Sequence, residues 1–355
     1  MLFLLAILVR NYRSKTFKVS VFDRKATGAK IIVFPEYGLF FPHYLTSRED
    51  IYKLLEEIPD PIRRVNPCRE LGGKEDFLIQ HTLSCIAKNY SLYLIANIGA
   101  KENCPQNNKQ CTQNGVYHFN ANVAYSPSGV HLGRYFKKNL RDFEKWYDVP
   151  TSTVPSCFKT PYGTIGMLIS YDIFNSEVAI DLIENRKIDI IALSSVWINT
   201  VPFHAIPFHA SWASIMGITL FVSNLKNKDD MMFGSGIYTP YNVLKHSSKS
   251  YEDELLMASL DILSTRRDIT YFPDVKLSRL FIREAKEKFK AYIDGVNYTM
   301  SLLNGRDNEA KTKICLKNFC CFVIIKNKAV NVTNFAVGIY RGNSKGSENI
   351  VESCL

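Results

Sequence analysis

Short apolar runs that alternate with longer amphipathic stretches are the feature that most restricts how this chain can fold. Five runs rich in Ile, Val and Leu predict buried strands, at residues 30–34, 91–99, 163–170, 188–195 and 218–224. Helix candidates lie between them, at residues 46–57, 74–88, 175–186 and 206–216. Residues 116–138 predict a hairpin with a Pro-Ser-Gly turn at 127–129. Strands alternating with helices predict an α/β fold.

The character of the chain changes after residue 262. The alternation of strands and helices weakens there, and charged residues, cysteines and glycosylation sequons become frequent. We therefore predict a boundary between residues 262 and 275, with a smaller domain after it. A length of 355 residues with 46% apolar residues allows one large or two ordinary domains, whose cores do not need disulfides to fold.

The formal net charge of +10 raises the question of a nucleic-acid or membrane partner. The basic residues are scattered, however, and neither an RNA-binding motif nor a helix-turn-helix motif accompanies them. We therefore predict no nucleic-acid partner. The apolar start of the chain, residues 1–9, is too short to span a bilayer, so no stable membrane span is predicted. This segment resembles the apolar part of a signal peptide, and the alternative is a buried strand of an incomplete chain.

Nine cysteines and three sequons indicate the secretory pathway, and we predict a secreted, disulfide-bonded glycoprotein. Cys104 and Cys111 bracket a polar stretch that a disulfide would close. Four more cysteines cluster near the C-terminus, at 315, 320, 321 and 354, and the odd total leaves at least one thiol unpaired. CxxC pairs are absent, which argues against a zinc ribbon. The predicted glycosylation sites are Asn89, Asn297 and Asn331.

Three side chains with catalytic potential stand at the ends of predicted strands, where ligand sites form in α/β sheets. Glu36 follows the strand at 30–34, Lys137 ends the hairpin, and Ser170 ends the strand at 163–170. Taken singly, each residue has an ordinary alternative: a solvated loop carboxylate, a surface lysine and a helix-capping serine. The coincidence of all three at strand ends favours a functional interpretation.

Several blocks of sequence resemble one known family. They are VFPEYGL, RYFKKNL, GMLISYDIF, SSVWINTVP, FHASWA and FGSGIYTP, in this order, and KICLKNFCCFV further along the chain. In order and spacing they resemble the blocks of biotinidases and vanins, which are pantetheine hydrolases of the carbon–nitrogen hydrolase (nitrilase) superfamily. The resemblance covers residues 28–325. It implies a nitrilase-type α-β-β-α sandwich over residues 1–264 and a smaller, mainly-β base domain over 265–355.

The resemblance also implies roles for individual residues. Glu36 corresponds to the general base, Lys137 to the catalytic lysine, and Ser170 to the position where relatives carry the nucleophilic cysteine. Residues in substrate-binding or supporting positions are Glu144, Tyr171, Trp197, His209, Ser235 and Gly236. The implied partner is a small non-peptide amide of the pantetheine or biotinyl type. No cofactor is expected, because the chain lacks a phosphate-binding glycine loop, and no residue spacing predicts a metal site.

Serine in the nucleophile position weakens the implied chemistry. A cysteine is partly thiolate near neutral pH, whereas a serine hydroxyl is a far weaker acid that needs a stronger base. Three interpretations stay open: an amide hydrolase with weak turnover, a secreted pseudoenzyme that binds without hydrolysis, and a structural module. We expect neither a histidine nor Cys157 to replace the missing thiol, because His209 belongs to a matching block and Cys157 lies thirteen residues before Ser170.

The N-terminal segment is a second departure from the family pattern. Relatives have a strand and a long helix before the glutamate block, whereas only 34 residues precede Pro35 here and they match that helix poorly. We therefore expect an abbreviated chain or a start that is not the natural one. A missing first strand would leave an open sheet edge.

Overall fold

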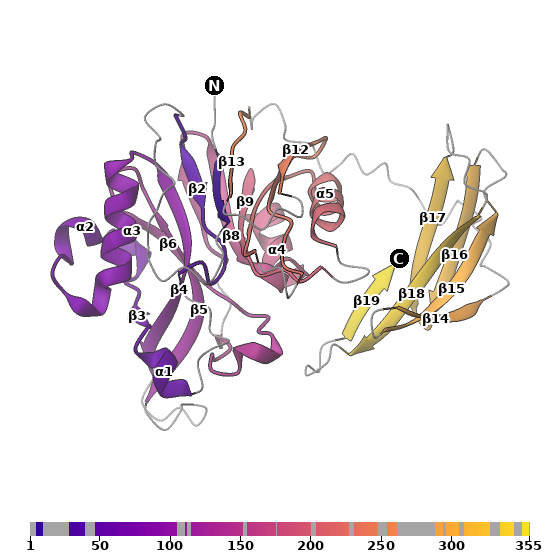
Figure 1. Cartoon of the computed structure of the whole chain (residues 1–355), viewed down its shortest axis with the longest axis horizontal. Coiled ribbons are helices and arrows are strands. Elements are labelled where there is room, and N and C mark those ends of the chain that lie inside the picture. The colour runs from indigo at the N-terminus through magenta and orange to yellow at the C-terminus, as the bar shows by residue number, and fades with distance from the viewer. Residues whose placement is uncertain are drawn as a thin grey trace. The chain divides into compact units, whose positions relative to one another are not determined.

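The computed structural model describes fifteen segments of the chain, and the numbers below refer to them. They are residues 5–9, 28–39, 47–104, 111, 115–151, 155–174, 176–199, 204–226, 231–247, 254–260, 288–293, 296–304, 309–326, 334–343 and 350–354. The chain divides into two compact units, one of Met1–Asn199 with Ala205–Ile269 and one of Thr200–His204 with Thr270–Leu355 (Figure 1). The predicted boundary at 264 and 265 lies outside the described residues and stays a prediction.

The first sheet of the larger unit has seven strands. Its strands are β1 (Leu5–Val9), β2 (Ile31–Val33), β3 (Glu56–Glu57), β4 (Tyr93–Asn103), β5 (Val116–Tyr125), β6 (His131–Phe136) and β13 (Glu254–Leu256). The order is β13-β1-β2-β4-β5-β6, and β3 also pairs with β4. β1, β2 and β4 are parallel, whereas β4, β5 and β6 form an antiparallel meander. Residues 5–9, from the apolar start of the chain, thus form β1. This strand lies between β13 and β2, so β2 is not at the edge of the sheet.

The second sheet of this unit has six strands in the order β12-β11-β10-β9-β8-β7. They are β7 (Cys157–Thr160), β8 (Gly163–Ile169), β9 (Ile190–Ser195), β10 (Thr219–Asn224), β11 (Gly236–Tyr238) and β12 (Val243–His246). β8, β9 and β10 are parallel, and all residues of β9 and β10 are buried. Central parallel strands are covered on both faces, which explains their almost continuous apolar sequence.

The helices of the larger unit are short. They are α1 (Arg48–Tyr52), α2 (Pro67–Glu70), α3 (Leu78–Asn89), α4 (Ser176–Ile180) and α5 (Ala205–Met216). Single-turn 3-10 helices lie at Pro61–Arg63, Glu75–Phe77, Asp142–Glu144 and Ser170–Phe174, and a π-turn lies at Asp181–Asn185. The predicted helix at 206–216 is confirmed as α5. The predicted helix at 74–88 corresponds to α3 together with the 3-10 turn at Glu75–Phe77 that precedes it. α4 ends early because the chain continues as the π-turn.

The predicted helix at 46–57 is wrong in its second half. Ser47 caps the start of α1, because its hydroxyl accepts a hydrogen bond from the Asp50 amide at 3.1 Å, and the helix ends at Tyr52. Glu56 then pairs with Ala100 of β4, and its carboxylate accepts the Gln80 amide at 3.0 Å near the start of α3. Pairing with the sheet and with the open end of a helix therefore outweighs the local helical pattern.

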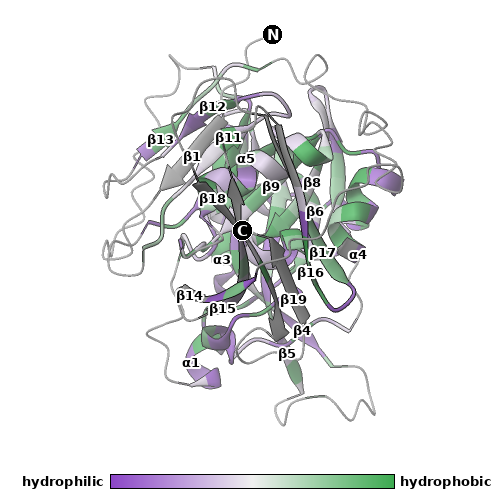
Figure 2. Ribbon diagram, turned by 90° about the vertical axis from the view of Figure 1, so that its right-hand side faces the viewer, coloured by the Kyte–Doolittle hydropathy of each residue, from purple (hydrophilic) through white to green (hydrophobic). Residues whose placement is uncertain are grey.

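The elements of the larger unit form four layers. Figure 1 shows α2 and α3 on the outer side of the first sheet, and α4 and α5 on the outer side of the second. Between the sheets, the Asn122 side chain donates to the carbonyl of Leu168 at 3.1 Å. Leu83 and Ala87 of α3 pack in one core cluster with Leu94 of β4. The central strands β8 and β9 are coloured mostly hydrophobic in Figure 2, as buried layers require. This is the α-β-β-α arrangement expected of a nitrilase-type fold.

The described residues of the smaller unit lie mainly in strands. β14 (Phe289–Ile293), β15 (Val296–Asn304), β18 (Asn334–Asn343) and β19 (Ile350–Cys354) form a four-stranded antiparallel sheet, and β16 (Glu309–Leu316) pairs with β17 (Phe319–Lys326). Ile314, Cys321 and Ile339 form a small buried cluster. The expectation of a smaller, mainly-β C-terminal part agrees with these strands.

Three disulfides join described cysteines: Cys68–Cys85, Cys104–Cys111 and Cys315–Cys320. The second confirms the pairing expected from the polar stretch between its cysteines. Cys321 is also disulfide-bonded, and Cys157 is free. The predicted glycosylation site at Asn89 is exposed at the end of α3, the backbone of Asn297 lies in β15, and Asn331 lies outside the described residues. No helix in the described ranges has the length and apolar character needed to cross a membrane.

Candidate functional site

The structure brings the three strand-end residues together in the first unit. Glu36 follows β2, Lys137 follows β6 and Ser170 follows β8, and all three side chains are buried. The Lys137 ammonium donates to Glu36 Oε1 at 2.7 Å. The Ser170 hydroxyl donates to Glu36 Oε2. Because β2 and β6 belong to one sheet and β8 to the other, the site depends on the two sheets packing face to face.

A second carboxylate, Glu144, completes the charged group. The short turn at Asp142–Glu144 presents this side chain, and Lys137 Nζ donates to its Oε2 at 2.6 Å. The Arg141 amide donates to the same oxygen at 2.7 Å. One ammonium therefore lies between two buried carboxylates, and its two hydrogen bonds fix the position of the lysine end.

Burial and mutual charge set the protonation of this group. Burial raises the pKa of the Glu36 carboxyl, the charge of Lys137 opposes that rise, and the charge of Glu144 adds to it. Burial alone would lower the pKa of Lys137, but the charges of Glu144 and Glu36 outweigh it and raise the pKa above the usual range. The lysine is therefore held as an ammonium, while Glu36 has gained proton affinity, as a base needs.

The backbone at Ser170 lies in an unusual conformation. Its φ is +44°, in the left-handed region that costs a residue with a Cβ of the order of 1 kcal/mol or more. The Val196 amide donates to Ser170 Oγ at 2.8 Å and to Glu36 Oε2 at 2.9 Å. Ser195 Oγ lies 3.4 Å from Ser170 Oγ. The sharp turn after β8 thus aims the hydroxyl at the carboxylate, and a backbone amide fixes both.

Asn120 connects the charged groups and was missed from the sequence. Its amide nitrogen lies 2.8 Å from Glu36 Oε1, 2.8 Å from Glu144 Oε1 and 2.7 Å from the Tyr37 hydroxyl. Tyr37 also donates to Glu144. Asn97 donates to Asn120 Oδ1 at 2.6 Å and accepts the Tyr37 amide at 3.0 Å. This buried network orients both carboxylates toward the lysine.

A sequence signal for Asn120 does exist. His118, Asn120 and Asn122 occupy alternate positions of β5, so they share one face of the strand, and all three are buried. Buried polar side chains that alternate with apolar ones need hydrogen-bond partners on that face. The pattern marks β5 as a strand that faces a polar site, although it does not name the partners.

Aromatic rings gather beside the nucleophile position. Tyr171, the residue after Ser170, stacks on Trp197 with ring centroids 4.7 Å apart and an angle of 7° between the planes. Phe208 stacks on Trp197 at 5.0 Å, and Phe174 lies at an angle to it at 5.7 Å. The Arg141 guanidinium lies 4.3 Å from the centroid of Tyr171. The predicted residues Tyr171 and Trp197 thus form an aromatic wall with Phe174 and Phe208.

The other predicted supporting residues lie behind this wall. Ser235 Oγ accepts the Asn224 amide at 2.9 Å, and Asn224 Oδ1 accepts the Trp197 amide at 2.7 Å, so Ser235 acts on the site through Asn224. Gly236 is close to the Tyr238 ring, which a Cβ there would meet at 2.5 Å. His209 is fully buried with its ring centroid 4.6 Å from that of Trp197.

His209 does not pair with the nucleophile position. Both of its ring nitrogens are without a hydrogen-bond partner among the described residues, and burial lowers its pKa to about 3. The partners of Ser170 Oγ in the same part of the chain are Glu36, Val196 and Ser195. The described side chains therefore form no Ser-His pair, and Cys157 lies at the start of β7, where burial raises the pKa of its thiol.

A buried aspartate fixes the loop that carries Lys137. Asp172 accepts the Asn139 amide at 2.7 Å and the Tyr135 hydroxyl at 2.8 Å. Burial raises its pKa to about 6, although the nearby Lys137 charge opposes the shift. Asp172 thus connects the end of β6 to the turn after β8, and so fixes the positions of Lys137 and Ser170 relative to each other.

Metal-ligating side chains gather elsewhere in the described residues. One ligand atom from each of Cys68, His81 and Cys85, on α2 and α3, lies within 4.8 Å of the other two, and the two sulfurs are joined in a disulfide. Around Ser170, by contrast, the carboxylates of Glu36 and Glu144 are both engaged by the lysine. This arrangement of two carboxylates and an ammonium can move a proton to and from the Ser170 hydroxyl.

Comparison with known proteins gives consistent matches. Residues 16–218 match the sequence model of the family described as carbon-nitrogen hydrolase. The chain is 30% identical to pantetheinase of Homo sapiens over 89% of this chain, and 28% identical to biotinidase of Rattus norvegicus over 89%. An amidase from Nesterenkonia sp. has a similar fold, with a TM-score of 0.54 and 16% identity over 78% of this chain and 95% of the amidase.

The matched parts of the relatives are incomplete. The alignments span 61% of the human pantetheinase and 66% of the rat biotinidase. The similarity therefore concerns about two thirds of the length of each relative.

Proposed function

Since this chain belongs to the carbon–nitrogen hydrolase family, we propose that it binds a small non-peptide amide at Ser170 and hydrolyses it weakly or not at all. The observation that carries the proposal is the contact of three buried groups: the Ser170 hydroxyl with Glu36, and Glu36 with the Lys137 ammonium. Ser170 in the nucleophile position, Glu36 as the base and Lys137 as the cation thus form one chain of hydrogen bonds. Names of matched relatives, pantetheinase and biotinidase, support pantetheine-like or biotinyl amides as the ligand class.

The geometry supports one sequence of proton transfers. Glu36 takes the Ser170 proton while Oγ attacks the amide carbon, and the carbonyl oxygen becomes an oxyanion. Lys137 uses two of its three protons on Glu36 and Glu144, which leaves the third for that oxyanion. Such a donor contributes about 3–4 kcal/mol to a transition state. Glu36 then gives its proton to the leaving amine, and water releases the acyl group from Ser170 by the same route in reverse.

The nucleophile atom limits the rate of this sequence. Glu36 is the base in contact with Ser170, and a carboxylate removes a proton from a hydroxyl far less readily than from a thiol. In a mutant of the Nesterenkonia amidase, which has a similar fold, the acetamide moiety of fluoroacetamide is added covalently at the active-site cysteine. Ser170 therefore keeps the position and hydrogen bonds of a nucleophile but lacks the acidity of one.

The aromatic wall supports a flat or extended ligand of modest size. Tyr171 and Phe174 retain exposed surface, whereas Trp197 behind them is buried, so the wall reaches from the solvent to the charged group. Arg141 over Tyr171 places a positive charge at its outer part. A ligand amide at Ser170 would then extend along this wall, with an acceptor group near Arg141.

Three forms of the purified chain test the proposal: the natural sequence, Ser170→Cys and Ser170→Ala, each assayed with pantetheine and with a biotinyl amide. We expect Ser170→Cys to exceed the natural chain by at least about 100-fold in turnover, because a thiol is the stronger acid and nucleophile. If the natural chain turns over weakly and Ser170→Ala abolishes that turnover, then the protein is a slow hydrolase. Turnover only in Ser170→Cys, with substrate binding by all three forms, assigns the pseudoenzyme. Absence of turnover and of binding in all three forms contradicts the proposal.

We also propose that the protein is secreted. Three disulfides between described cysteines support this, because structural disulfides persist in oxidising compartments. Expression through the secretory pathway with and without an endoglycosidase tests it, with glycans expected at Asn89, Asn297 and Asn331. A chain that is retained, reduced and unglycosylated contradicts the proposal.

A further inference from the structure

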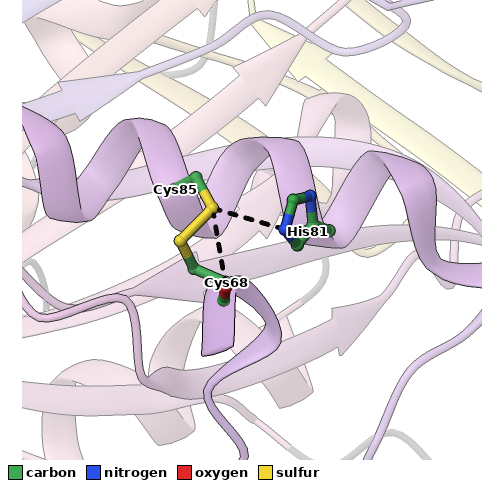
Figure 3. Close-up of side chains that lie close together, drawn as sticks. All are labelled: Cys68, His81 and Cys85. Atoms are coloured by element: carbon green, nitrogen blue, oxygen red, sulfur yellow. Dashed lines mark hydrogen bonds between the residues drawn. A yellow bond between two sulfur atoms is a disulfide. The ribbon is translucent and has the colours of Figure 1, made fainter. Parts of the chain in front are cut away.

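A second group of reactive side chains lies between α2 and α3. Cys68 of α2 is disulfide-bonded to Cys85 of α3, and His81 Nε2 lies 3.6 Å from Cys85 Sγ (Figure 3). His81 and Cys85 are four residues apart on one helix, so they share a face. One ligand atom from each of the three residues lies within 4.8 Å of the other two.

The nitrogen and one sulfur already stand at the spacing of a tetrahedral metal site. Bond lengths of about 2.3 Å to sulfur and about 2.0–2.1 Å to nitrogen place tetrahedral S and N ligands about 3.5 Å apart. The observed separation of Cys85 Sγ and His81 Nε2 is 3.6 Å. The two sulfurs would need to separate to about 3.8 Å by the same geometry, which requires the disulfide to be broken.

The chain leaves room beside the imidazole. A Cβ at Gly72 would lie 3.3 Å from His81 Nε2. Gly72 is not among the glycines with positive φ, whereas Gly73 has a φ of +77°. The backbone thus gives no reason for glycine at position 72, and the missing side chain keeps the ligating nitrogen open. Cys68, His81 and Cys85 are each half-buried, so a reductant and an ion can reach them.

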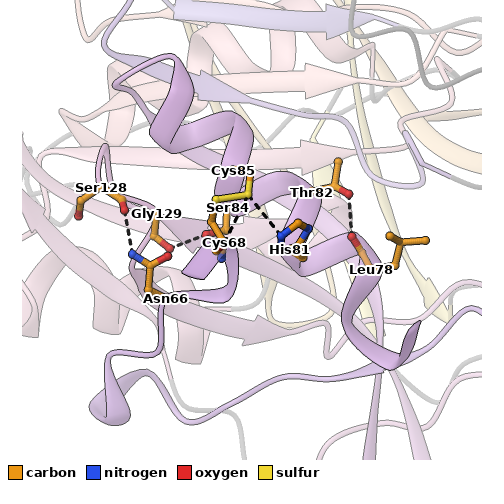
Figure 4. Close-up of a disulfide and its surroundings, with 9 residues drawn as sticks. All are labelled: Asn66, Cys68, Leu78, His81, Thr82, Ser84, Cys85, Ser128 and Gly129. Carbon is orange, nitrogen blue, oxygen red and sulfur yellow. Dashed lines mark hydrogen bonds between the residues drawn. A yellow bond between two sulfur atoms is a disulfide. The ribbon is translucent and has the colours of Figure 1, made fainter. Parts of the chain in front are cut away.

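Hydrogen bonds hold α2 near α3 independently of the disulfide. Ser84 Oγ accepts the Cys68 amide at 3.0 Å and donates to the Gly129 carbonyl at 2.6 Å (Figure 4). Asn66, just before α2, donates to the Ser128 carbonyl at 2.9 Å. Both helices are therefore tied to the turn between β5 and β6, and the two thiols would stay neighbours after reduction.

We propose that Cys68, His81 and Cys85 form a Zn²⁺ site wherever the chain meets a thiol reductant that breaks the Cys68–Cys85 bond, which an oxidising compartment keeps closed. Two thiols of a reductant, RSH, supply two electrons and two protons; they convert the Cys68–Cys85 bond into two thiols and leave as RS–SR. Zn²⁺ then binds the two sulfurs as thiolates and Nε2 of His81, releasing two protons, with water as fourth ligand. The ion replaces the disulfide as the cross-link between α2 and α3.

The test uses the full chain and Zn²⁺ itself. The oxidised chain and the chain reduced by a phosphine are titrated with Zn²⁺ against a chromophoric chelator, and with Co²⁺ to observe the sulfur-to-metal charge-transfer band. The reduced chain should bind one ion with that band, and the oxidised chain should not. His81→Ala should weaken binding at least about tenfold, since even loss of an outer partner of a metal ligand costs that much. Gly72→Val should weaken it by crowding Nε2.

Matched variants separate this site from the other cysteines. Thr82→Ala, on the same helix, and Cys104→Ser with Cys111→Ser should keep the wild-type affinity after reduction. Equal Zn²⁺ affinity in the reduced natural chain and in His81→Ala overturns the proposal, as does equal affinity in the oxidised chain. A reduced chain that loses its circular dichroism signal also overturns it, because the site requires folded helices.

Discussion

The Ser170 site and the Cys68–Cys85 cross-link show two ways in which one unit positions reactive side chains. At the first, Glu36, Lys137 and Ser170 are fully buried, and each has at least two hydrogen-bond partners. At the second, the side chains are half-buried and are held by one covalent bond and by the backbone of short helices. Buried charge demands a complete set of partners, whereas sulfur at the surface tolerates an incomplete one.

The two regions also differ in whether the reactive atom is oxygen or sulfur. The chain places an oxygen nucleophile, Ser170, inside the charged network, and it places sulfur in cross-links and in the half-buried Cys157. The network around Ser170 would suit a thiol equally well, because its amide donor and its carboxylate do not depend on the atom. The weak turnover that we propose therefore rests on the oxygen atom of Ser170 and not on the groups around it.

Removal of charge from the buried region should give the largest loss of stability. Lys137→Met keeps the aliphatic stem but leaves Glu36 and Glu144 buried without a cation. We expect the free energy of unfolding to fall by about 3–5 kcal/mol. Denaturant unfolding at neutral pH measures it.

Lys138 provides the matched control for that substitution. Its ion pair with Glu177 is largely exposed, so Lys138→Met should change stability by at most about 1 kcal/mol. If both methionine variants lose the same small amount, then the buried group does not carry the charges assigned to it, and the contrast between the two regions disappears.

Loss of the surface cross-link should rank second. Cys68→Ser with Cys85→Ser removes a bond that spans 17 residues, and we expect a loss of about 3 kcal/mol from the wider freedom of the unfolded chain. Substitution of the pair Cys104 and Cys111, which are separated by 7 residues, should cost slightly less, about 2.5 kcal/mol. Thermal unfolding compares the two.

The same double variant tests whether the regions are independent. Introduced into the Ser170→Cys background, it should leave amide turnover unchanged, because the described hydrogen bonds of the site come from β4, β5 and β9 and from the segments after β2, β6, β8 and β9, and not from α2 or α3. A fall in turnover at temperatures where the double variant is fully folded would show that the cross-link and the site are coupled.

The sequence was sufficient for the parts of the fold that rest on local pattern. Apolar runs located β2, β4, β8, β9 and β10, and strand ends located Glu36, Lys137 and Ser170, because a strand end is a local property. The helix expected over 46–57 was shortened by pairing of Glu56 with β4, which is a tertiary effect that no local pattern contains. The Cys68–Cys85 disulfide was likewise missed, since its pairing depends on how α2 meets α3.

The candidate site divides in the same way. The family resemblance implied the roles of Glu36 and Lys137 and added Glu144, whereas Asn120 and Asn97 were missed although they join the carboxylates. Amides that only orient other groups leave no chemical signature in a sequence. Ser235 was predicted as a substrate-binding or supporting residue, and its hydrogen bond to Asn224, which in turn accepts the Trp197 amide, could be found only from coordinates.

Acid should act on the buried region through His209, with a smaller effect per pH unit than either substitution above. Burial lowers the folded-state pKa of His209 to about 3, below its usual value of 6.5. The unfolded chain therefore binds the proton first, and stability is lost as pH falls from 6.5 toward 3, by up to about 1.4 kcal/mol per pH unit. His209→Phe, measured by unfolding at several pH values, should remove this slope.

The opposing shift of Asp172 makes that measurement decisive. Its raised pKa, about 6, means that the folded state holds the extra proton, so its contribution falls as pH rises from 3.8 to 6. In the natural chain the two slopes partly cancel, and His209→Phe should expose a net loss of stability with rising pH in this window. An unchanged profile in His209→Phe would mean that the imidazole reaches solvent or a hydrogen-bond partner. The region around Trp197 would then not be the closed, fully buried one that the comparison with the Cys68–Cys85 surface assumes.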